Sequence, residues 1–463
     1  MLTRLGDTLA RFFRATAPDP FVIAILLTAF VFLVGVVFVG MDGNSGVALA
    51  QAPGFMLDAW QGGLWDLLAF SMQMSLILVT GSALASSPPI ARLIRGVARL
   101  PRSGPQAVAM TALVAMSAGL INWGFGLIVG AILARDVHAS LRERGLFAPR
   151  GLLAAAGYGA MLTWHGGLSG SATLKASTLE GQAGVLGADL ANEIGAISTS
   201  VSIFGTLNLI TTGGLLVATP LLLMAMCPKV ARDESAYEPV RTEPVRTEDD
   251  DEHGALPRFL ERSPMVVWLL AAPAFVWLSL DFGTKGLGGL TLNTAILTFF
   301  ALGVVLHNGA LNYMRAIEDG ARGCAGIIIQ FPLYAGIMGM MSASGLSVAI
   351  SSRFVNVAGG SEGALASMTV LSAGLVNLFV PSGGGQWAVQ GPIVMEAAAQ
   401  SGASPVRLLM AVAYGDQLTN MLQPFWALPL LAICGVKARD VVGYTAVVMV
   451  AALAWVVVCV SVI

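Results

Sequence analysis

Long apolar runs alternate with short polar connections along the whole chain of 463 residues. A helix needs about 20 apolar residues to cross the hydrocarbon core of a bilayer. The pattern therefore predicts an all-α polytopic membrane protein with about nine transmembrane helices. We place them at 19–40, 67–86, 151–166, 194–226, 264–280, 290–307, 323–344, 407–433 and 441–462.

Two further apolar runs, 105–137 and 364–400, are each interrupted near the middle. The first reaches Asn122 and continues as Trp-Gly-Phe-Gly, and the second reaches Asn377 and continues as Leu-Phe-Val-Pro-Ser-Gly-Gly-Gly. Irregular backbone at membrane depth is tolerated where it is buried in protein or lines a cavity, and transporters bind their ligands at such breaks. We interpret each run as a re-entrant helical hairpin.

Basic residues in short loops mark the cytoplasmic side of a membrane protein. Four arginines lie within 92–102 and four more within 135–150, so the run between them begins and ends in the cytoplasm, as a hairpin does. The loop 41–66 has no Lys or Arg and is predicted to lie outside. The same count predicts a cytoplasmic N-terminus and a periplasmic C-terminus.

Three polar features recur at a nearly constant distance along the chain. Gln73 and Gln330 differ by 257 positions, Asn122 and Asn377 by 255, and Tyr158 and Tyr414 by 256. A fixed offset indicates a duplicated unit. Since the charge pattern gives the two copies opposite directions, we predict inverted repeats.

The expected organisation follows from this duplication. A charged segment, 228–263, holds six Lys or Arg and ten Asp or Glu, which is typical of a solvated, disordered cytoplasmic linker. The predicted units are an N-terminal segment with a leader span at 1–64, a first repeat at 65–227, this linker, connecting and leader spans forming a scaffold at 264–312, and a second repeat at 313–463.

Composition agrees with a membrane protein. The chain is 56% hydrophobic and 11% charged, against about 25% charged residues in soluble domains. A net charge of -2 argues against a nucleic-acid partner, and membrane lipids surround the predicted spans. The four cysteines are far apart and are predicted to be buried apolar residues, and no resident cofactor is expected.

Four polar interruptions could carry the chemistry: the two hairpin tips and the stretches 163–173 and 414–424. Helix N-termini, free N–H groups and hydroxyls suit a small carboxylate, and amide and carboxylate oxygens suit Na⁺ as a coupling ion. Candidate substrate ligands are Asn122, Gly124, Ser169, Ser171, Asn377, Ser382, Gly383, Gly384 and Gln386. Candidate Na⁺ ligands are Asn122, Asn377, Asp416 and Asn420. The alternative is that these breaks only kink helices.

Four titratable residues lie near these breaks, and the first three have two interpretations each. Asp416 lies in an otherwise uncharged span, where a carboxylate costs on the order of 3 kcal/mol, so it is a candidate cation or proton site or else a structural partner. His165 is a core histidine or a proton site, and Lys175 attracts an anion or extends to the interface. Glu396 is expected near the outer interface.

An intramembrane serine protease is a rival from another class, because Gly167-Leu-Ser169-Gly170 matches its Gly-x-Ser-Gly motif. That chemistry needs a histidine base on the serine. The only other histidine in a predicted span is His307, at the end of its span. The motif match covers only four residues, and the protease mechanism does not require an inverted repeat. We therefore favour transport.

Longer strings carry a family resemblance. The chain resembles the short-chain fatty acid transporters of the AtoE type from Pro18-Asp19-Pro20 to its last span. The most specific strings are Asn122-Trp-Gly-Phe-Gly126, Phe379-Val-Pro-Ser-Gly-Gly-Gly385 with Gln386-Trp387 and Gln390-Gly-Pro392, and Gln423-Pro-Phe-Trp-Ala-Leu-Pro429. That family is similar in organisation to the ion transporter superfamily of dimeric, elevator-type carriers.

The resemblance implies cation-coupled uptake of acetoacetate, butyrate or a similar monocarboxylate across the bacterial inner membrane by a homodimer. Better-known carboxylate carriers of the superfamily have Ser-Asn-Thr at their hairpin tips, which this chain lacks. The choice between Na⁺ and H⁺ therefore stays open. A carrier of dicarboxylates or other carboxylates, and a cation/proton antiporter using Asp416, are the alternatives.

Overall fold

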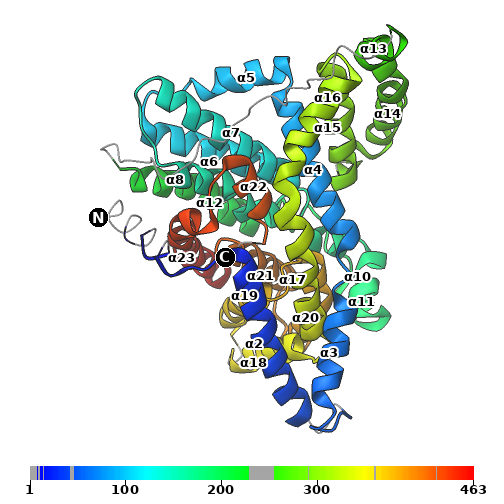
Figure 1. The fold of residues 1–463 in the computed structure, drawn as a ribbon. Coiled ribbons are helices and arrows are strands. Elements are labelled where there is room, and N and C mark those ends of the chain that lie inside the picture. Colours follow the sequence, from blue (N-terminus) through cyan, green and yellow to red (C-terminus); the bar gives the residue numbers. More distant parts are fainter. Residues whose placement is uncertain are drawn as a thin grey trace.

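The structure is a computed structural model, and it describes residues 8, 11–13, 15–41, 46–228, 255–289, 291–358, 361–423 and 425–463. All regular elements in these ranges are helices (Figure 1). The first half contains α2 (Pro20–Met41), α3 (Ala52–Gly63), α4 (Leu68–Ser86), α5 (Pro88–Ala98), α6 (Gly104–Ile121), α7 (Trp123–Glu143), α8 (Arg150–Tyr158), the 3-10 helices η1 (Gly159–Leu162) and η2 (Trp164–Gly166), α9 (Ser171–Ala176), α10 (Leu179–Leu186), α11 (Ala188–Ile194) and α12 (Thr206–Met226).

The second half repeats much of this order. It contains α13 (Ala255–Arg262), α14 (Pro264–Lys285), η3 (Gly286–Gly289), α15 (Leu292–Leu306), α16 (Ala310–Ala321), η4 (Arg322–Cys324), α17 (Ala325–Ala343), α18 (Leu346–Val357), α19 (Glu362–Asn377), α20 (Gly383–Ser401), α21 (Pro405–Thr419), α22 (Leu428–Cys434) and α23 (Ala438–Val462). Most of the predicted linker, 229–254, lies outside the described residues, and its last part is the helix α13.

Eight helical stretches in the described part of the chain are long and apolar enough to cross a membrane. They are 20–41, 52–86, 104–121, 123–143, 206–226, 264–285, 310–343 and 438–462. The predicted spans 151–166 and 407–433 are not continuous helices. The first passes into η1 and η2, and the second stops at Thr419 and resumes at Leu428.

The two interrupted runs are helical pairs, as predicted, with the turns at the predicted places. α6 ends at Ile121 and α7 begins at Trp123, while α19 ends at Asn377 and α20 begins at Gly383. With 18 and 21 residues, α6 and α7 measure about 27 and 31 Å at 1.5 Å per residue. Each arm of this hairpin is thus as long as a membrane span.

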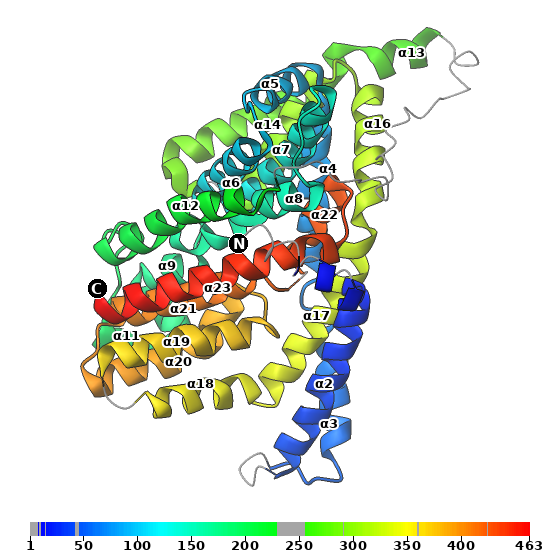
Figure 2. The ribbon, with the colours of Figure 1, turned by 90° about the vertical axis from the view of Figure 1, so that its left-hand side faces the viewer.

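The helices form two parts that lie side by side. Figure 2 shows α2, α3, α4, α16 and α17 as a column along one side, and α12, α23, α19, α20 and α18 stacked on the other. Within the column α17 packs against α2, α3 and α4, and α4 packs against α15 and α16. Outward faces of α2 and α14 are apolar, including Leu26 and Leu33 on α2 and Leu269 on α14, which suits contact with lipid.

Small residues allow backbones to touch inside both parts. A Cβ on Gly63 would lie 2.9 Å from the Cα of Gly339, so α3 and α17 meet at backbone contact. Gly130 and Gly157 do the same for α7 and α8, where a Cβ on Gly130 would lie 2.2 Å from the carbonyl oxygen of Gly157. Close approach of this kind replaces hydrophobic driving force in helix association within lipid.

Short helices of each half pack on long helices of the other half. The short helix α9 packs on α20 of the second half, and α22 packs on α7 of the first half. Leu428, the first residue of α22, lies 257 positions after Ser171, the first residue of α9, which is the spacing of the repeated glutamines. All four cysteines are buried, as predicted.

Candidate functional site

The first hairpin tip is fastened to the break in its own half. Asn122 begins α7 as its N-cap, and its Oδ1 accepts a hydrogen bond from the backbone N–H of Phe125 at 3.0 Å. The backbone N–H of Trp123 donates to Ser169 Oγ at 3.0 Å, and the N–H of Leu168 donates to the carbonyl of Leu120 at 2.7 Å. Asn122 and Ser169 therefore lie together, and both hold the tip in place.

The second tip has the same construction with different residues. Ser382 is the N-cap of α20, and its Oγ accepts from the N–H of Gly385 at 3.2 Å. Asn377, the counterpart of Asn122 by sequence offset, is instead the last residue of α19 and is fully buried. Its side chain faces α21, not the start of α20.

A buried histidine–carboxylate pair joins the two halves of the chain. Asp416 Oδ2 lies 2.5 Å from His165 Nδ1, and the two residues are 1% and 0% exposed. The backbone N–H of Ala172 donates to His165 Nε2 at 3.1 Å. Since Nε2 accepts, Nδ1 carries the proton that is donated to Asp416.

The start of α20 lies directly on this pair. A Cβ on Gly383 would lie 2.7 Å from Trp164 Cη2, 2.9 Å from His165 Cε1 and 3.2 Å from Asp416 Oδ2. Only a residue without a side chain allows this approach. The tip of the second hairpin thus meets the break of the first half.

The next residue of the tip, Gly384, faces α9. A Cβ there would lie 3.7 Å from Lys175 Nζ and 3.8 Å from Ser171 Cβ, so both side chains border the first turn of α20. Lys175 is exposed and Ser171 is partly buried.

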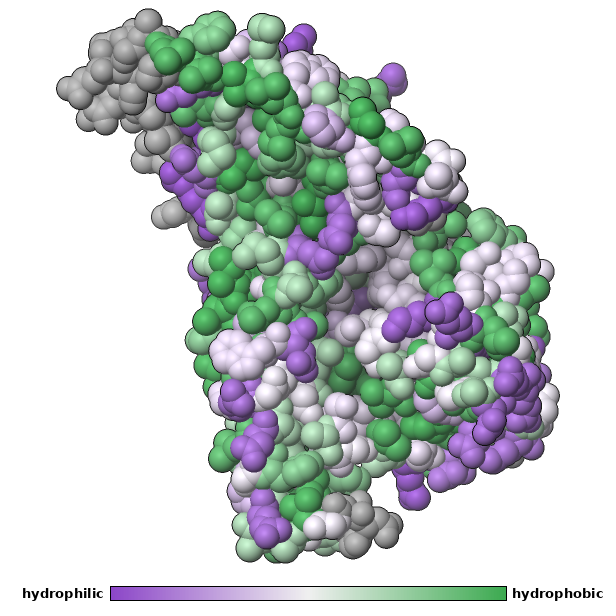
Figure 3. Space-filling view, turned by 90° about the vertical axis from the view of Figure 1, so that its right-hand side faces the viewer, coloured by the Kyte–Doolittle hydropathy of each residue, from purple (hydrophilic) through white to green (hydrophobic). Residues whose placement is uncertain are grey.

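On the side of the molecule that lies to the right in Figure 1, the surface is hollowed between an upper and a lower part, and pale residues of intermediate hydropathy line the hollow (Figure 3).

A cluster of oxygens surrounds the side chain of Asn377. Its Nδ2 lies 2.8 Å from the carbonyl oxygen of Asp416, 3.0 Å from Thr419 Oγ1 and 3.0 Å from Asn420 Oδ1. An amide nitrogen has only two hydrogens for these three oxygens. Asn377 Oδ1 and Asn420 Nδ2 are buried and have no hydrogen-bond partner among the described residues.

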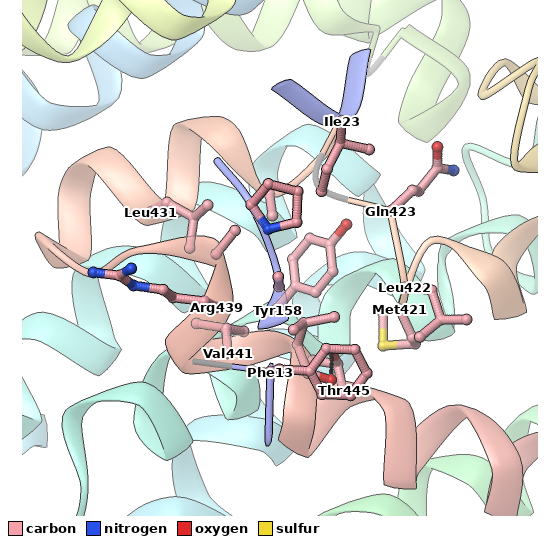
Figure 4. A pocket seen from close by; sticks show the side chains of 15 residues that line it. Phe13, Ile23, Tyr158, Met421, Leu422, Gln423, Leu431, Arg439, Val441 and Thr445 are labelled. Atoms are coloured by element: carbon pink, nitrogen blue, oxygen red, sulfur yellow. Dashed lines mark hydrogen bonds between the residues drawn. The ribbon is translucent and has the colours of Figure 1, made fainter. Parts of the chain in front are cut away.

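The cluster backs onto a cavity of about 340 Å³, which Figure 4 shows. Its lining is mostly apolar and includes Tyr158, Met421 and Gln423, with Arg439 as its charged member. The hydroxyl of Tyr158 donates to the carbonyl of Asn420 at 2.9 Å, and Gln423 Nε2 donates to Asn420 Oδ1 at 2.9 Å. The wall of the cavity and the amide cluster therefore share residues.

Two candidate ligands from the sequence lie elsewhere. Gln386 points into the hairpin, where its Nε2 donates to the carbonyl of Ala373 and to Gln390 Oε1, both at 2.7 Å. At the first tip, a Cβ on Gly124 would lie 3.0 Å from Ile77 Cδ1 and 3.2 Å from Leu292 Cδ1. Gly124 thus faces α4 and α15.

Sequence reasoning passed over Trp164 and Thr419. Trp164 stacks on His165 with ring centroids 4.3 Å apart, and Thr419 donates to the carbonyl of Gly374 at 2.9 Å beside Asn377. In the sequence, Trp164 directly precedes His165 and Thr419 directly precedes Asn420, and this adjacency could have identified both residues. Neither histidine of the predicted spans serves Ser169 as a base: both ring nitrogens of His165 have other partners, and His307 Nε2 pairs with the carbonyl of Ala83.

Known proteins similar to this chain point in one direction. The profile of a family described as "Short chain fatty acid transporter" matches residues 1–463. Two proteins named for short-chain fatty acid transport are similar along nearly their whole length. One from Escherichia coli (strain K12) is 39% identical and one from Haemophilus influenzae (strain ATCC 51907 / DSM 11121 / KW20 / Rd) is 37% identical, each alignment covering 96% of both chains.

Among solved structures, the Alcanivorax borkumensis YdaH transporter is similar at 14% identity and a TM-score of 0.42, covering 96% of this chain and 97% of that one. Neisseria gonorrhoeae MtrF, described as an antimetabolite efflux pump, is similar at 14% identity and a TM-score of 0.39, covering 97% and 96%.

Proposed function

Because the chain belongs to the short-chain fatty acid transporter family, we propose that it is a secondary active transporter that imports acetoacetate, butyrate or similar monocarboxylates across the bacterial inner membrane. It is a multi-pass membrane protein with eight apolar helical stretches of sufficient length in its described part. A gradient of Na⁺ or H⁺ drives the import. The protein moves its substrate without covalent chemistry.

The contact of Gly383 and Gly384 with the break in the first half carries this proposal. The N–H groups of both glycines belong to the first turn of α20, which has no intrahelical acceptors, and the helix dipole favours an anion there. Ser171 and Lys175 border the same turn. A single carboxylate matches this modest positive charge better than two would.

The amide cluster supports a coupling cation. If Asn377 turned its amide by 180°, Oδ1 would join the oxygens of Asp416, Thr419 and Asn420 around one ion, and its unpaired oxygen would gain a partner. Oxygen ligands of this kind suit Na⁺. Asn122 lies at the other tip, where its Oδ1 already caps α7, so its part in a cation site has the weaker support.

Several architectural features belong to the same proposal. The exchange of α9 and α22 between the halves supports inverted repeats, and the same-side charge clusters support re-entrant hairpins. We propose that the part with both hairpins moves against the column of α2, α3, α4, α16 and α17 in an elevator mechanism. The protein works as a homodimer, with its N-terminus in the cytoplasm and its C-terminus in the periplasm.

Uptake by purified protein in proteoliposomes tests the function. We expect labelled butyrate or acetoacetate to accumulate when a Na⁺ or a proton gradient is imposed, each being varied separately. If neither gradient drives uptake of any short monocarboxylate, the proposal is wrong. Asn377→Ala and Ser382→Ala should abolish uptake in protein that is still folded and inserted, and full activity of both would remove the assigned site.

A buried His165–Asp416 pair is also what a cation/proton antiporter would need. This second candidate predicts Na⁺ flux driven by a pH gradient in the absence of any organic anion. A carrier of dicarboxylates is the other alternative, and a competition panel of mono- and dicarboxylates against labelled butyrate separates it from the main proposal.

A further inference from the structure

We infer that a cluster of aromatic rings beside the second tip forms the binding site for the acyl chain and limits its length. We call these residues the aromatic cluster; they are Phe70, Trp123, Trp164, Phe331, Tyr334, Phe425 and Trp426. The inference rests on the proposed function, because it assigns the part of the site that takes the apolar end of the same substrate.

The rings come from both halves and from five different segments. Phe70 on α4 lies 6.1 Å from Trp123 at the start of α7 and 5.7 Å from Trp426 in the connection between α21 and α22. Trp123 lies 5.0 Å from Trp426, with the planes at 70°. Edge-to-face rings at such distances pack favourably and form an apolar surface of fixed shape.

Trp164 connects the aromatic cluster to the polar end of the site. Its ring is stacked on His165, lies edge-on to Trp123 at 6.5 Å, and meets the position of a Cβ on Gly383. One side chain thus touches the proposed carboxylate site and the aromatic rings. An acid with its carboxylate at Gly383 and Gly384 has this apolar surface next to its carbon chain.

The back of the aromatic cluster is closed. Phe331, Tyr334 and Phe425 are at most 1% exposed, and the rings of Phe331 and Phe425 are 4.1 Å apart. Phe70 and Trp123 are only partly buried and form the accessible side. A chain of two to four carbons can cover the accessible rings, whereas a longer chain meets the closed back.

Ordinary core packing is the competing explanation. Buried Trp and Tyr side chains usually find partners for their N–H and O–H groups. Trp164 Nε1 and the Tyr334 hydroxyl are buried and have no partner among the described residues. An aromatic lining with a few polar groups is the composition of a small-ligand site, and here it adjoins the proposed carboxylate site through Trp164.

The test is the chain-length profile in proteoliposomes. Acetate, butyrate, hexanoate and octanoate compete with labelled butyrate in the wild type, in Phe70→Ala and in Phe300→Ala. Phe300 is the matched control, because it is a partly buried phenylalanine that packs on Tyr313 in a separate cluster. Because Phe70 packs on Phe331 of the closed back at 5.7 Å, its removal opens space in that direction. We expect Phe70→Ala to raise the preference for hexanoate over butyrate about tenfold, since two more methylenes are then accommodated, and Phe300→Ala to leave the ratio unchanged.

Binding gives a second measurement that does not depend on transport. 4-Bromobutyrate should quench the tryptophan fluorescence of the purified protein, and Trp426→Phe with Trp123→Phe should remove at least half of that quenching. An unchanged hexanoate-to-butyrate ratio in Phe70→Ala, or a double variant that keeps more than half of the quenching, would overturn the inference. Uptake of butyrate by the wild type would then leave the proposed function intact. If the aromatic cluster is quenched but no uptake occurs, the binding site is supported and the proposed transport function is wrong.

If Phe70→Ala is not recovered as folded protein, Phe70→Leu takes its place. The smaller loss of volume should still raise the hexanoate preference severalfold, and a ratio equal to that of the wild type counts against the inference.

Discussion

The two hairpin tips look like copies in the sequence, but they differ in what they touch. At the first tip Asn122 caps α7 and Ser169 holds the next backbone N–H, so these hydrogen bonds stay within the first half, while packing contacts of the tip reach Trp426 and Leu292 of the second half. At the second tip Ser382 has the capping role and Gly383 lies on Trp164, His165 and Asp416, across both halves. Under the proposed function, the first tip anchors its hairpin and the second tip contacts the substrate.

This difference shows that a repeated residue type need not repeat a role. Asn122 and Asn377 share an offset, yet one accepts at a helix start and the other donates into an oxygen cluster. The residue that does the work of Asn122 in the second half is Ser382, five positions beyond Asn377. Roles follow the local geometry of the turn, and the second turn is longer because it contains Pro381.

The largest expected effect is at Gly383. Gly383→Ala places a methyl group against Trp164 and His165 at less than 3.0 Å, so the tip must withdraw from the pair. We expect butyrate uptake to fall at least 100-fold, on the order of 3 kcal/mol in transition-state terms.

The matched controls are Gly384→Ala, where the nearest atom is 3.7 Å away, and Gly124→Ala at the first tip, with neighbours at 3.0 and 3.2 Å. Both should keep uptake within about tenfold of the wild type. A Gly383→Ala variant as active as these controls would erase the distinction between the two tips.

A serine pair, one on each side of Gly170, gives the next effect. Ser169→Ala removes the acceptor of the Trp123 N–H and should lower the free energy of unfolding by about 1 kcal/mol, seen as a lower melting temperature in detergent. Ser171→Ala should leave the melting temperature unchanged and raise the KM for butyrate severalfold. The reverse result, a KM change only for Ser169→Ala, would mean that the first tip holds the substrate.

The smallest effect is expected at the bases of the hairpins. The first base is tied by Arg144, whose Nη1 donates to the carbonyls of Arg99 and Pro101 at 3.1 and 2.8 Å. The second is tied by an ion pair between Arg407 and Glu362 at 3.3 Å. Arg407→Gln should cost about 0.5 kcal/mol, less at high salt.

Arg144→Gln removes these two hydrogen bonds and a third, from Nε to the carbonyl of Ser140. Because the side chain is exposed to solvent, the loss should be only about 0.5 kcal/mol, independent of salt. Thermal unfolding in low and high salt measures both. If the loss of stability depended on salt in Arg144→Gln but not in Arg407→Gln, the assignment of hydrogen bonds to Arg144 and of an ion pair to Arg407 would be wrong.

Sequence patterns predicted much of this fold, because apolar runs in a bilayer protein have a direct physical meaning. The ends of α2, α4, α17 and both tips fall within a few residues of the predicted positions. The breaks after Tyr158 and Thr419 were seen as polar interruptions, but not as ends of helices. Their backbone geometry depends on packing against the hairpins, which the run of apolar residues does not encode.

The site was predictable as regions and less so as single residues. Asp416 stood out as a charge in an apolar run, yet its partner His165 is 251 positions away and no local pattern connects them. Gln386 was a candidate ligand because it follows three glycines in the sequence. Its position on the first turn of α20 instead points its side chain into the hairpin. Direction around a helix axis depends on where the helix starts, and the cap at Ser382 determines that start.

The burial of all four thiols has a practical consequence for watching this protein move. Because Cys227, Cys324, Cys434 and Cys459 are each at most 4% exposed, the natural chain should react slowly with maleimide reagents, so single cysteines can be introduced at exposed sites without first removing the native ones. Spin labels at Leu57 on α3 and Leu174 on α9, both exposed, would then report the separation of the column from the second tip by pulsed electron resonance, with and without butyrate.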